Sequence, residues 1–250
     1  MAIENNQKSV IIDASGVYYR ELNAQLRELV SHGVQKIEII NSYGQRYIGT
    51  DLNKPVTIEI TGTPGNDLGS FMDGPTIIVH GNAQDGTGNT MNAGKIIVHG
   101  RAGDTTMLSA RGGEVYIRDS VGYRAGIHIK EYGDKVPVLV IGGTAQDFVG
   151  EYMAGGVLVL LGINVETHHA SYIGTGMHGG LIYIRGNVAE HQLGKEVGVA
   201  QLDDKDRQIL NKLIVEYCNL FSYDSDTLLE QEFIKLYPKF LRPYGKLYTT

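Results

Sequence analysis

Histidines occur in two groups whose spacing could support metal binding. His80 and His99 each follow a short run of Ile and Val, 19 residues apart, and His168, His169 and His178 form a looser second group. Imidazole nitrogens are common zinc ligands, so two rings on neighbouring repeats could share an ion. No carboxylate or thiol recurs at ligand spacing beside either group, and a repeat alone brings like residues into stacks. We therefore expect His80 and His99 to stack, and we assign no metal-binding residue.

Three aspartates form a second series with a regular period. Asp67, Asp85 and Asp104 follow one another at 18 and 19 residues. Carboxylates in register could bind calcium, but the nonapeptide calcium repeat is absent. Asx-turns, in which an aspartate accepts a hydrogen bond from backbone close by in the chain, explain the series better.

One glycine motif resembles a dinucleotide-binding fingerprint. Residues 174–179 read Gly-Thr-Gly-Met-His-Gly and match G-x-G-x-x-G. That fingerprint follows a strand and opens a helix, whereas here it leads into the strand-like run Leu181–Ile184. The context favours a repeat corner, and we predict no cofactor-binding residue.

Other catalytic motifs are missing. The sequence contains no G-x-x-x-x-G-K-[ST], no H-E-x-x-H and no G-x-S-x-G. Serines and histidines are both present, so a hydrolase that uses a Ser–His pair stays open as an alternative, without a local motif in its favour. We predict no catalytic residue.

The elements that carry these residues belong to a repeat. Seven short apolar runs recur: Val56–Ile60, Thr76–Val79, Lys95–Val98, Glu114–Ile117, Val138–Ile141, Val157–Leu160 and Leu181–Ile184. Glycine follows most of them, first at a spacing of 19 residues (Gly62, Gly81, Gly100) and later at 20 and 24 (Gly142, Gly162, Gly186). A fixed period near 20 residues indicates a solenoid.

The runs are too short for helices and are rich in Val and Ile between Gly, Asn and Asp, as strands are. The leucine and asparagine ladder of a leucine-rich repeat is absent, and 33 of 250 residues are glycine, which suits tight corners. We predict an all-β core, a right-handed parallel β-helix of about seven coils with an α/β N-terminal cap and a C-terminal helical tail. Its domains would be 1–54, 55–190 and 191–250.

The flanking segments follow different patterns. In the cap we predict a strand at 9–12, a helix at 17–31, a strand at 37–40, a turn at 41–45 and a return at 46–49. Beyond the solenoid we predict a helix at 203–221 that acidic residues cap, a shorter helix at 227–234 and an irregular, aromatic tail at 233–244. Such a tail would pack on the solenoid or on another subunit.

Two repeats are longer than the others. The extra residues fall in the loops 119–137 and 163–176. Insertions in a solenoid lie on its flank, where partners commonly bind. We expect these two loops to form an interaction surface.

Composition limits the classes of function. The net charge of −6 and the pI of about 5.7 argue against nucleic acid and anionic membranes as partners. No apolar run reaches the roughly 18 residues of a membrane span, and the first residues lack the pattern of a signal peptide. A single cysteine, Cys218, excludes an internal disulfide or a thiolate cluster. We expect a cytoplasmic protein.

The repeat also resembles a known family. Residues 81–85, 94–104, 142–147, 152–156 and 174–180 are similar to the GXGXG domain of glutamate synthase, the β-helical C-terminal region of its large subunit. Residues 18–22 and 44–49 resemble the lead-in of the free-standing archaeal-type version. The similarity covers about residues 10 to 220. One of the subunits of formylmethanofuran dehydrogenase shares the same coil.

The resemblance implies a role without chemistry of its own. In that family the glutaminase nucleophile, the FMN site and the iron–sulfur cysteines lie in other domains, which this domain supports and spaces. It implies a scaffold without cofactor, whose partners are a glutaminase-type amidotransferase subunit and an FMN/iron–sulfur glutamate synthase subunit. Self-association through exposed strand edges is a further expectation. A scaffold of a formylmethanofuran dehydrogenase-like or other amidotransferase-linked enzyme and a free-standing esterase are the alternatives.

Overall fold

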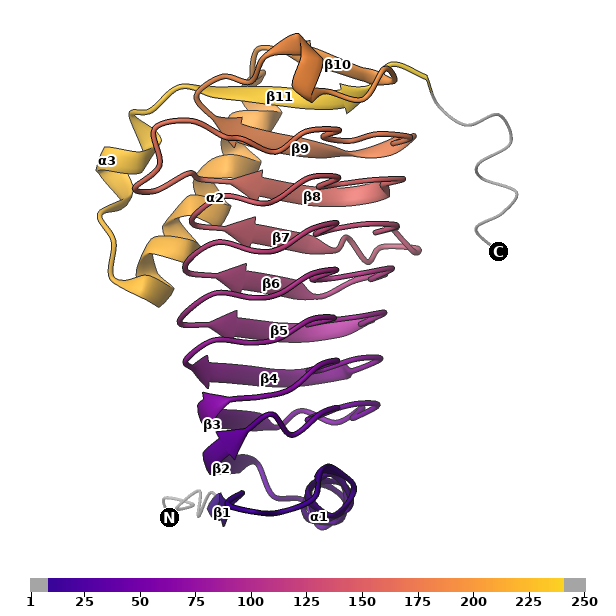
Figure 1. Cartoon of the computed structure of the whole chain (residues 1–250), viewed down its shortest axis with the longest axis vertical. Coiled ribbons are helices and arrows are strands. Elements are labelled where there is room, and N and C mark those ends of the chain that lie inside the picture. The colour runs from indigo at the N-terminus through magenta and orange to yellow at the C-terminus, as the bar shows by residue number, and fades with distance from the viewer. Residues whose placement is uncertain (1–8, 241–250) are drawn as a thin grey trace, which may run out of the picture.

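The computed structural model describes residues 9–240, which form a β-solenoid with helices at its ends and along one side (Figure 1). One eleven-stranded sheet has the order β1-β2-β3-β4-β5-β6-β7-β8-β9-β11-β10. The repeat strands are β3 (Thr57–Thr63), β4 (Asp73–His80), β5 (Ala93–Val98), β6 (Glu114–Ile117), β7 (Val138–Ile141), β8 (Ala154–Leu160) and β9 (Gly179–Arg185). They coincide with the seven predicted runs, which confirms the solenoid.

Neighbouring coils are in register. Every strand from β1 to β8 pairs in parallel with the next strand along the chain. One inward column therefore runs through the whole stack and is fully buried: Ile37, Ile58, Ile77, Ile96, Val115, Leu139, Leu158 and Ile182. Burying this continuous apolar column is the main favourable term that stacks the coils.

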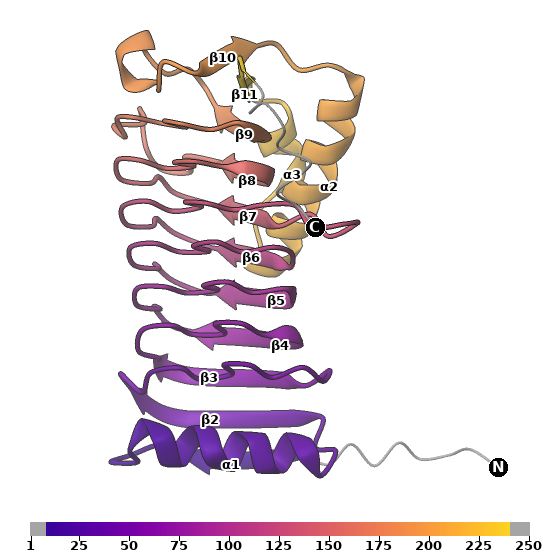
Figure 2. The ribbon, with the colours of Figure 1, turned by 90° about the vertical axis from the view of Figure 1, so that its right-hand side faces the viewer.

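The N-terminal end is closed by a helix. α1 (Tyr19–Ser31) buries Leu22, Leu26 and Val30 in the solenoid core. It lies below β2 (Lys36–Tyr43) in Figure 2, and Figure 1 shows it at the same end of the stack as β1 (Ser9–Asp13). The predicted strand and helix of the cap are confirmed, with α1 beginning at Tyr19. The predicted turn at 41–45 is wrong for residues 41–43, because β2 continues through them and pairs with β3. The sheet thus extends into the segment predicted as a cap, and residues 46–51 form a corner like those of later coils.

The C-terminal end departs more from prediction. After β9 come a 3₁₀ turn (Glu190–Gln192), β10 (Val197–Ala200), α2 (Asp204–Phe221), α3 (Ser225–Leu229) and β11 (Phe233–Pro238). Asp203 caps α2 by accepting from the backbone N–H of Lys205 and Asp206, as the acidic run predicted. The predicted helix at 227–234 is wrong beyond Leu229, and the predicted irregular tail is wrong for 233–238.

β11 forms because β9 offers a free strand edge. It inserts antiparallel between β9 and β10, which satisfies backbone groups on both sides. This long-range pairing overrides the local helical pattern of the sequence. Residues 241–244 of the predicted tail lie outside the described part of the chain.

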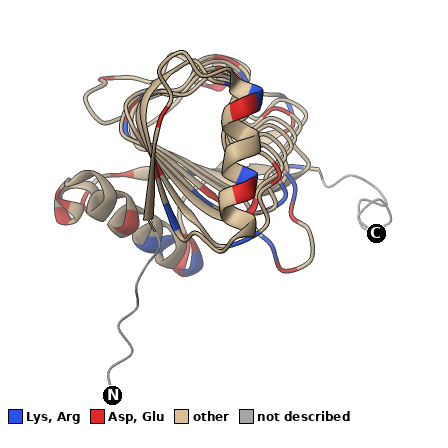
Figure 3. Ribbon diagram, turned by 90° about the horizontal axis from the view of Figure 1, so that it is seen from below, with Lys and Arg blue, Asp and Glu red and all other residues tan. Residues whose placement is uncertain are grey.

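α2 covers one outer wall of the solenoid. Seen along the axis, the coils superimpose (Figure 3), and α2 lies beside the coils of the C-terminal half (Figure 2). Its Leu210, Ile214 and Tyr217 join a second apolar cluster with outward-facing residues such as Val140 and Val159. The Tyr217 hydroxyl donates to the carbonyl oxygen of Arg118 at 2.7 Å, which ties the helix to the coil beneath it.

Candidate partner-binding surface

Each coil turns a corner of unusual backbone geometry just before its strand. We call this row of corners the corner ridge. Its first positions are Tyr47, Asp67, Gly86, Thr105, Arg124, Phe148 and Tyr172, and its fifth positions are Asp51, Phe71, Thr90, Ser109, His128, Tyr152 and Gly176. All of them, and the third positions between (Gly49, Gly69, Gly88, Met107, Gly126, Gly150, Gly174), have φ between 51° and 77°.

Along the corner ridge, the N–H groups at these three positions bond alternately to the next coil and to the previous coil. In the sixth corner the N–H groups of Phe148 and Tyr152 donate forward to the carbonyls of Ser171 and Thr175, at 2.9 and 2.8 Å. The N–H of Gly150, between them, donates backward to Ala125 at 2.8 Å. The second to fifth corners repeat the whole pattern, and the first and seventh, at the ends of the row, repeat part of it, so the left-handed positions are part of how coils bond to one another.

Left-handed backbone is unfavourable for the side chains found here. It costs about 1–2 kcal/mol for a residue with a Cβ and little for glycine, and bulky residues rarely adopt it. The chain uses glycine at Gly86 and Gly176, yet keeps Phe148, Tyr152 and Tyr172 at equivalent positions. Tyr152 is 46% exposed and Tyr172 53% exposed, so burial alone does not account for them.

These aromatic side chains form two stacks at the C-terminal end of the ridge. Phe148 and Tyr172 are 4.8 Å apart with ring planes at 8°, and the Arg124 guanidinium lies 4.8 Å from the Phe148 ring. His128 and Tyr152 stack at 5.3 Å and 10°. We call these five residues the C-terminal aromatic patch. Stacking offsets part of the backbone cost, at about 0.5–1.5 kcal/mol per pair.

The stack of His128 and Tyr152 requires glycine at position 176. Gly176 has φ +71°, and a Cβ on it would lie 2.4 Å from the Tyr152 ring.

The patch is also electrically balanced, because Arg124 forms an ion pair with the buried carboxylate of Glu151. A nearly neutral surface of Tyr, Phe and Arg has the composition of protein-binding hot spots.

The patch brings the two predicted interaction loops together. Arg124 and His128 come from the loop 119–137 and Tyr172 from the loop 163–176, and the coil stack places these loops on either side of the coil that carries Phe148. Sequence reasoning missed Phe148 and Tyr152, which lie between the two loops. The 24-residue steps from Arg124 to Phe148 to Tyr172 were the signal that could have found them.

His80 and His99 stack as predicted. Their rings are 5.4 Å apart at 25°, and His99 forms a T-shaped contact with Phe221, the last residue of α2. Burial lowers the pKa of His99, and the charges of His80 and Arg118 act in the same direction. The Glu59 carboxylate lies 3.9 Å from His80.

The second histidine group does not converge. The ring of His168 lies 3.3 Å from the Thr144 hydroxyl and 3.2 Å from the Arg185 carbonyl, and burial lowers its pKa. His169 instead contacts Thr167, and His178 contacts the carbonyl of Gly176. Across residues 9–240 no three or more His, Cys, Asp or Glu side chains are placed to hold a metal ion.

The aspartate series has a different role from the predicted one. Asp85 accepts from the backbone N–H of Asp104 at 2.8 Å, and Asp104 accepts from that of Tyr123 at 2.9 Å. The Asx-turn interpretation is therefore wrong for these two residues. Because adjacent strands lie about 4.8 Å apart, the carboxylate reaches the next coil, and the series links coils. Asp67 bonds to the side-chain amide of Asn89.

The G-x-G-x-x-G segment is a repeat corner, as predicted, because residues 174–178 turn directly into β9. Iron–sulfur clusters need several cysteine thiolates, and the chain has only Cys218, which is buried in α2. Burial raises the pKa of its thiol, which disfavours the thiolate. The residues present do not fit a cluster.

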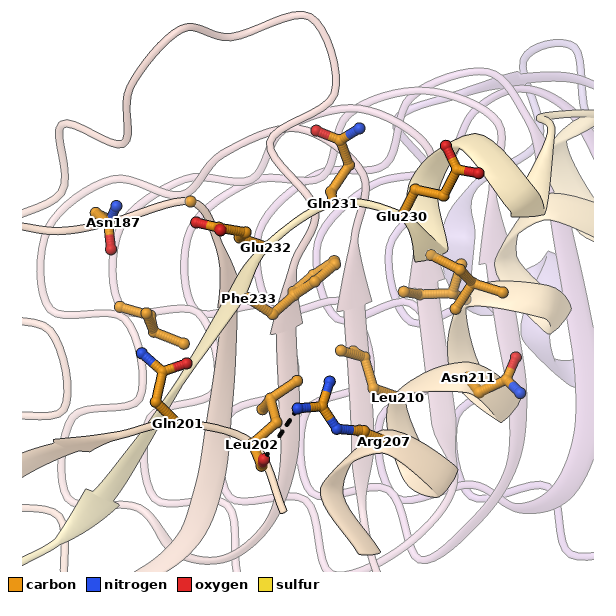
Figure 4. Close-up of a pocket in the computed structure, with 14 residues that line it drawn as sticks. Asn187, Gln201, Leu202, Arg207, Leu210, Asn211, Glu230, Gln231, Glu232 and Phe233 are labelled. Atoms are coloured by element: carbon orange, nitrogen blue, oxygen red, sulfur yellow. Dashed lines mark hydrogen bonds between the residues drawn. The ribbon is translucent and has the colours of Figure 1, made fainter. Parts of the chain in front are cut away.

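A groove of about 580 Å³ lies between α2, α3 and β11 (Figure 4). Phe233, Leu210 and Ile214 form apolar parts of its wall, and polar side chains such as Arg207 and Glu232 line the rest. Its lining contains no Ser, Thr, Cys or His, so it offers neither a side-chain nucleophile of the Ser–His type nor a histidine base.

The fold and the ridge define a protein class: β-solenoids whose glycine-rich coils turn through left-handed corners. The chain belongs to the GXGXG motif family, whose model matches residues 38–245. It is 50% identical over 253 residues to the "Uncharacterized protein MJ1350" of Methanocaldococcus jannaschii, and the match covers 97% of each chain. In the described part of the chain, none of the helices has the length and hydropathy to cross a bilayer.

Proposed function

We propose that this chain is a non-catalytic scaffold component of a cytoplasmic, glutamate synthase-like complex. The complex converts L-glutamine and 2-oxoglutarate to two molecules of L-glutamate with reducing equivalents. A glutaminase-type subunit releases the ammonia, and an FMN/iron–sulfur subunit performs the reductive step. This chain holds both subunits in register and contributes no cofactor.

The observation that carries the proposal is the C-terminal aromatic patch. Its rings are exposed although their backbone conformation favours glycine, which is the pattern expected where contact with a partner maintains a costly feature. Membership of the GXGXG motif family supports the choice of a glutamate synthase-like complex.

The solenoid is suited to spacing partners rigidly. One core runs through all coils, and side chains such as Asp85 and Asp104 bond each coil to the next. A partner bound at the patch is thereby fixed relative to anything bound elsewhere on the solenoid.

The first test is to capture the full-length chain from an extract of its native cells and identify bound proteins by mass spectrometry. We expect a glutaminase-type protein and an FMN/iron–sulfur protein. Molybdenum- or tungsten-enzyme subunits instead would assign the chain to a formylmethanofuran dehydrogenase-like complex. A chain that is recovered alone and hydrolyses a p-nitrophenyl ester would overturn the scaffold role.

A double variant, Tyr152→Ser with Tyr172→Ser, tests the surface itself. Hot-spot aromatics contribute about 2 kcal/mol or more each, so we expect retention of at least one partner to fall tenfold or more. Tyr132→Ser is the matched control, because Tyr132 is 50% exposed on the loop 119–137 but outside the patch. Equal retention by the double variant, with an unchanged circular dichroism spectrum, would exclude the patch as the contact.

A further inference from the structure

The opposite end of the corner ridge carries a second group of aromatic and cationic side chains. Tyr18 and Tyr19, at the start of α1, have ring centroids 4.6 Å apart, and Tyr19 lies 5.8 Å from Tyr47 on the first corner. Arg20 donates to the Tyr19 hydroxyl at 3.2 Å. The backbone of Arg46 is fixed to α1 by a 2.9 Å bond from the Asn23 amide to its carbonyl. We call Tyr18, Tyr19, Arg20, Arg46 and Tyr47 the N-terminal patch.

Neither arginine of this patch has an acidic partner within residues 9–240. Among these described residues no carboxylate oxygen lies within 4.0 Å of either guanidinium, and the nearest acids in sequence are Glu21 and Asp51. The bond from Arg20 is the largest cause of a lowered pKa at Tyr19, and the charge of Arg46 acts in the same direction. The N-terminal patch thus carries two positive charges, on Arg20 and Arg46, that are unpaired in the described part of the chain, although the chain has a net charge of −6.

The two ends of the ridge therefore differ in charge. At the C-terminal aromatic patch the charge of Arg124 is neutralised by Glu151, whereas Arg20 and Arg46 keep theirs available. Between the ends the ridge carries Asp67, Phe71, Gly86, Thr90, Thr105 and Ser109, and Phe71 is 51% exposed. Four coil steps separate Tyr47 from Arg124, the first residue of the C-terminal aromatic patch, which is about 19 Å at 4.8 Å per step, so the patches are separate surfaces.

We propose that the N-terminal patch binds a carboxylate-rich segment of a second partner protein. Guanidinium groups bind carboxylates bidentately, and tyrosine rings beside them supply apolar contact at low entropic cost. This inference rests on the scaffold role proposed above and deepens it. The two ends of one ridge select chemically different partners, which fixes their order along the solenoid.

The test measures anisotropy of a fluorescein-labelled decapeptide of alternating Glu and Gly with the purified full-length chain at low salt. We expect saturable binding that weakens at least tenfold in the Arg20→Gln, Arg46→Gln double variant. Arg27→Gln with Lys212→Gln removes the same charge from exposed positions on α1 and α2 and should leave the affinity within twofold. A decapeptide with Gln in place of Glu should bind at least tenfold more weakly.

Three results would overturn the proposal. Binding that is unchanged in the double variant would show that the arginines are not the site. Tighter binding of pyrophosphate or a ten-nucleotide dT strand through the same arginines would assign the patch to phosphate groups. A dimer of this chain that the double variant dissociates would make a second copy the occupant. Because the peptide test uses the isolated chain, it can fail while capture of the complex succeeds, and the reverse.

Discussion

The two halves of the solenoid have the same inner face and different outer faces. One outward column passes through Glu38, Glu59, Ile78, Ile97, Tyr116, Val140, Val159 and Tyr183 in successive strands. Its first members are charged and partly exposed, and from Ile97 onward all of them are buried. The change coincides with the wall that α2 covers.

The difference shows how strand sequence encodes what covers a sheet. In β3 burial alternates between Thr57, Ile58, Glu59 and Ile60, as in a strand with one face in water. In β7 all four residues of Val138–Ile141 are buried, as in a strand with both faces covered. The continuous apolar runs thus mark the coils on which α2 packs.

Among the changes considered, disrupting the contact between the sheet and α2 should reduce the free energy of unfolding most. Val159→Asp places a carboxylate against the apolar face of α2, where it has no partner. We expect a loss of about 3–5 kcal/mol in the free energy of unfolding, measured by urea denaturation. Detachment of α2 alone would appear as rapid proteolysis near residues 204–221.

The control for that variant lies in the same column of the uncovered half. Glu38→Val exchanges charge for an apolar group at a partly exposed site and should change the free energy of unfolding by about 0.5 kcal/mol or less. A similar loss in both variants would mean that the two outer faces do not differ in the way the burial pattern indicates.

Much of the fold could be predicted because the same strand-and-corner pattern occurs seven times in the sequence. The period, the Val- and Ile-rich runs and the glycines each point to one strand per coil. The covering helix was predicted as an element, but its position was not. The signal existed in the all-apolar runs Val138–Ile141 and Val157–Leu160, whose outward residues need a cover.

The remainder depended on contacts between distant segments. β11 pairs with the free edge of β9, which the residues of 233–238 do not reveal by themselves. Tyrosine gives no sign in a sequence that its backbone is left-handed, so the corner ridge was invisible as a surface. The two loops that contribute to the C-terminal aromatic patch were predicted because their repeats are longer than the others. Phe148 and Tyr152 were missed because their coil has no insertion.

The stability of the contact between His99 and the end of α2, where the covered half of the solenoid begins, should depend on pH. His99 lies against Phe221 at the end of α2, with His80 and Arg118 as its charged or titratable neighbours and Glu59 beside His80. Burial lowers the pKa of folded His99 below the unfolded value of about 6.5. The unfolded chain therefore binds the proton more readily, and stability falls as pH decreases from about 6.5 through the folded pKa. Above about pH 7 this histidine contributes no slope.

Urea denaturation of wild type and His99→Gln between pH 8 and 5 tests this boundary. We expect a shallower loss of stability in the variant, with the remaining slope from groups such as His168, whose pKa burial also lowers. Identical slopes in the two proteins would show that the end of α2 does not sense protonation of His99.

The smallest effect should come from the charged contacts at the edge of α2. Lys95 on β5 lies 2.7 Å from Glu216 on the helix and 3.2 Å from Glu114 on β6. Glu216→Gln leaves the pair with Glu114, so we expect a loss of about 0.2–1 kcal/mol that salt reduces further. Glu59→Gln is the matched variant in the uncovered half, where Lys36 lies 2.8 Å from Glu59, and its loss should be similar. If Glu216→Gln instead cost as much as Val159→Asp in the same urea experiment, ion pairing and not apolar burial would hold α2, and the outward column would not explain its position.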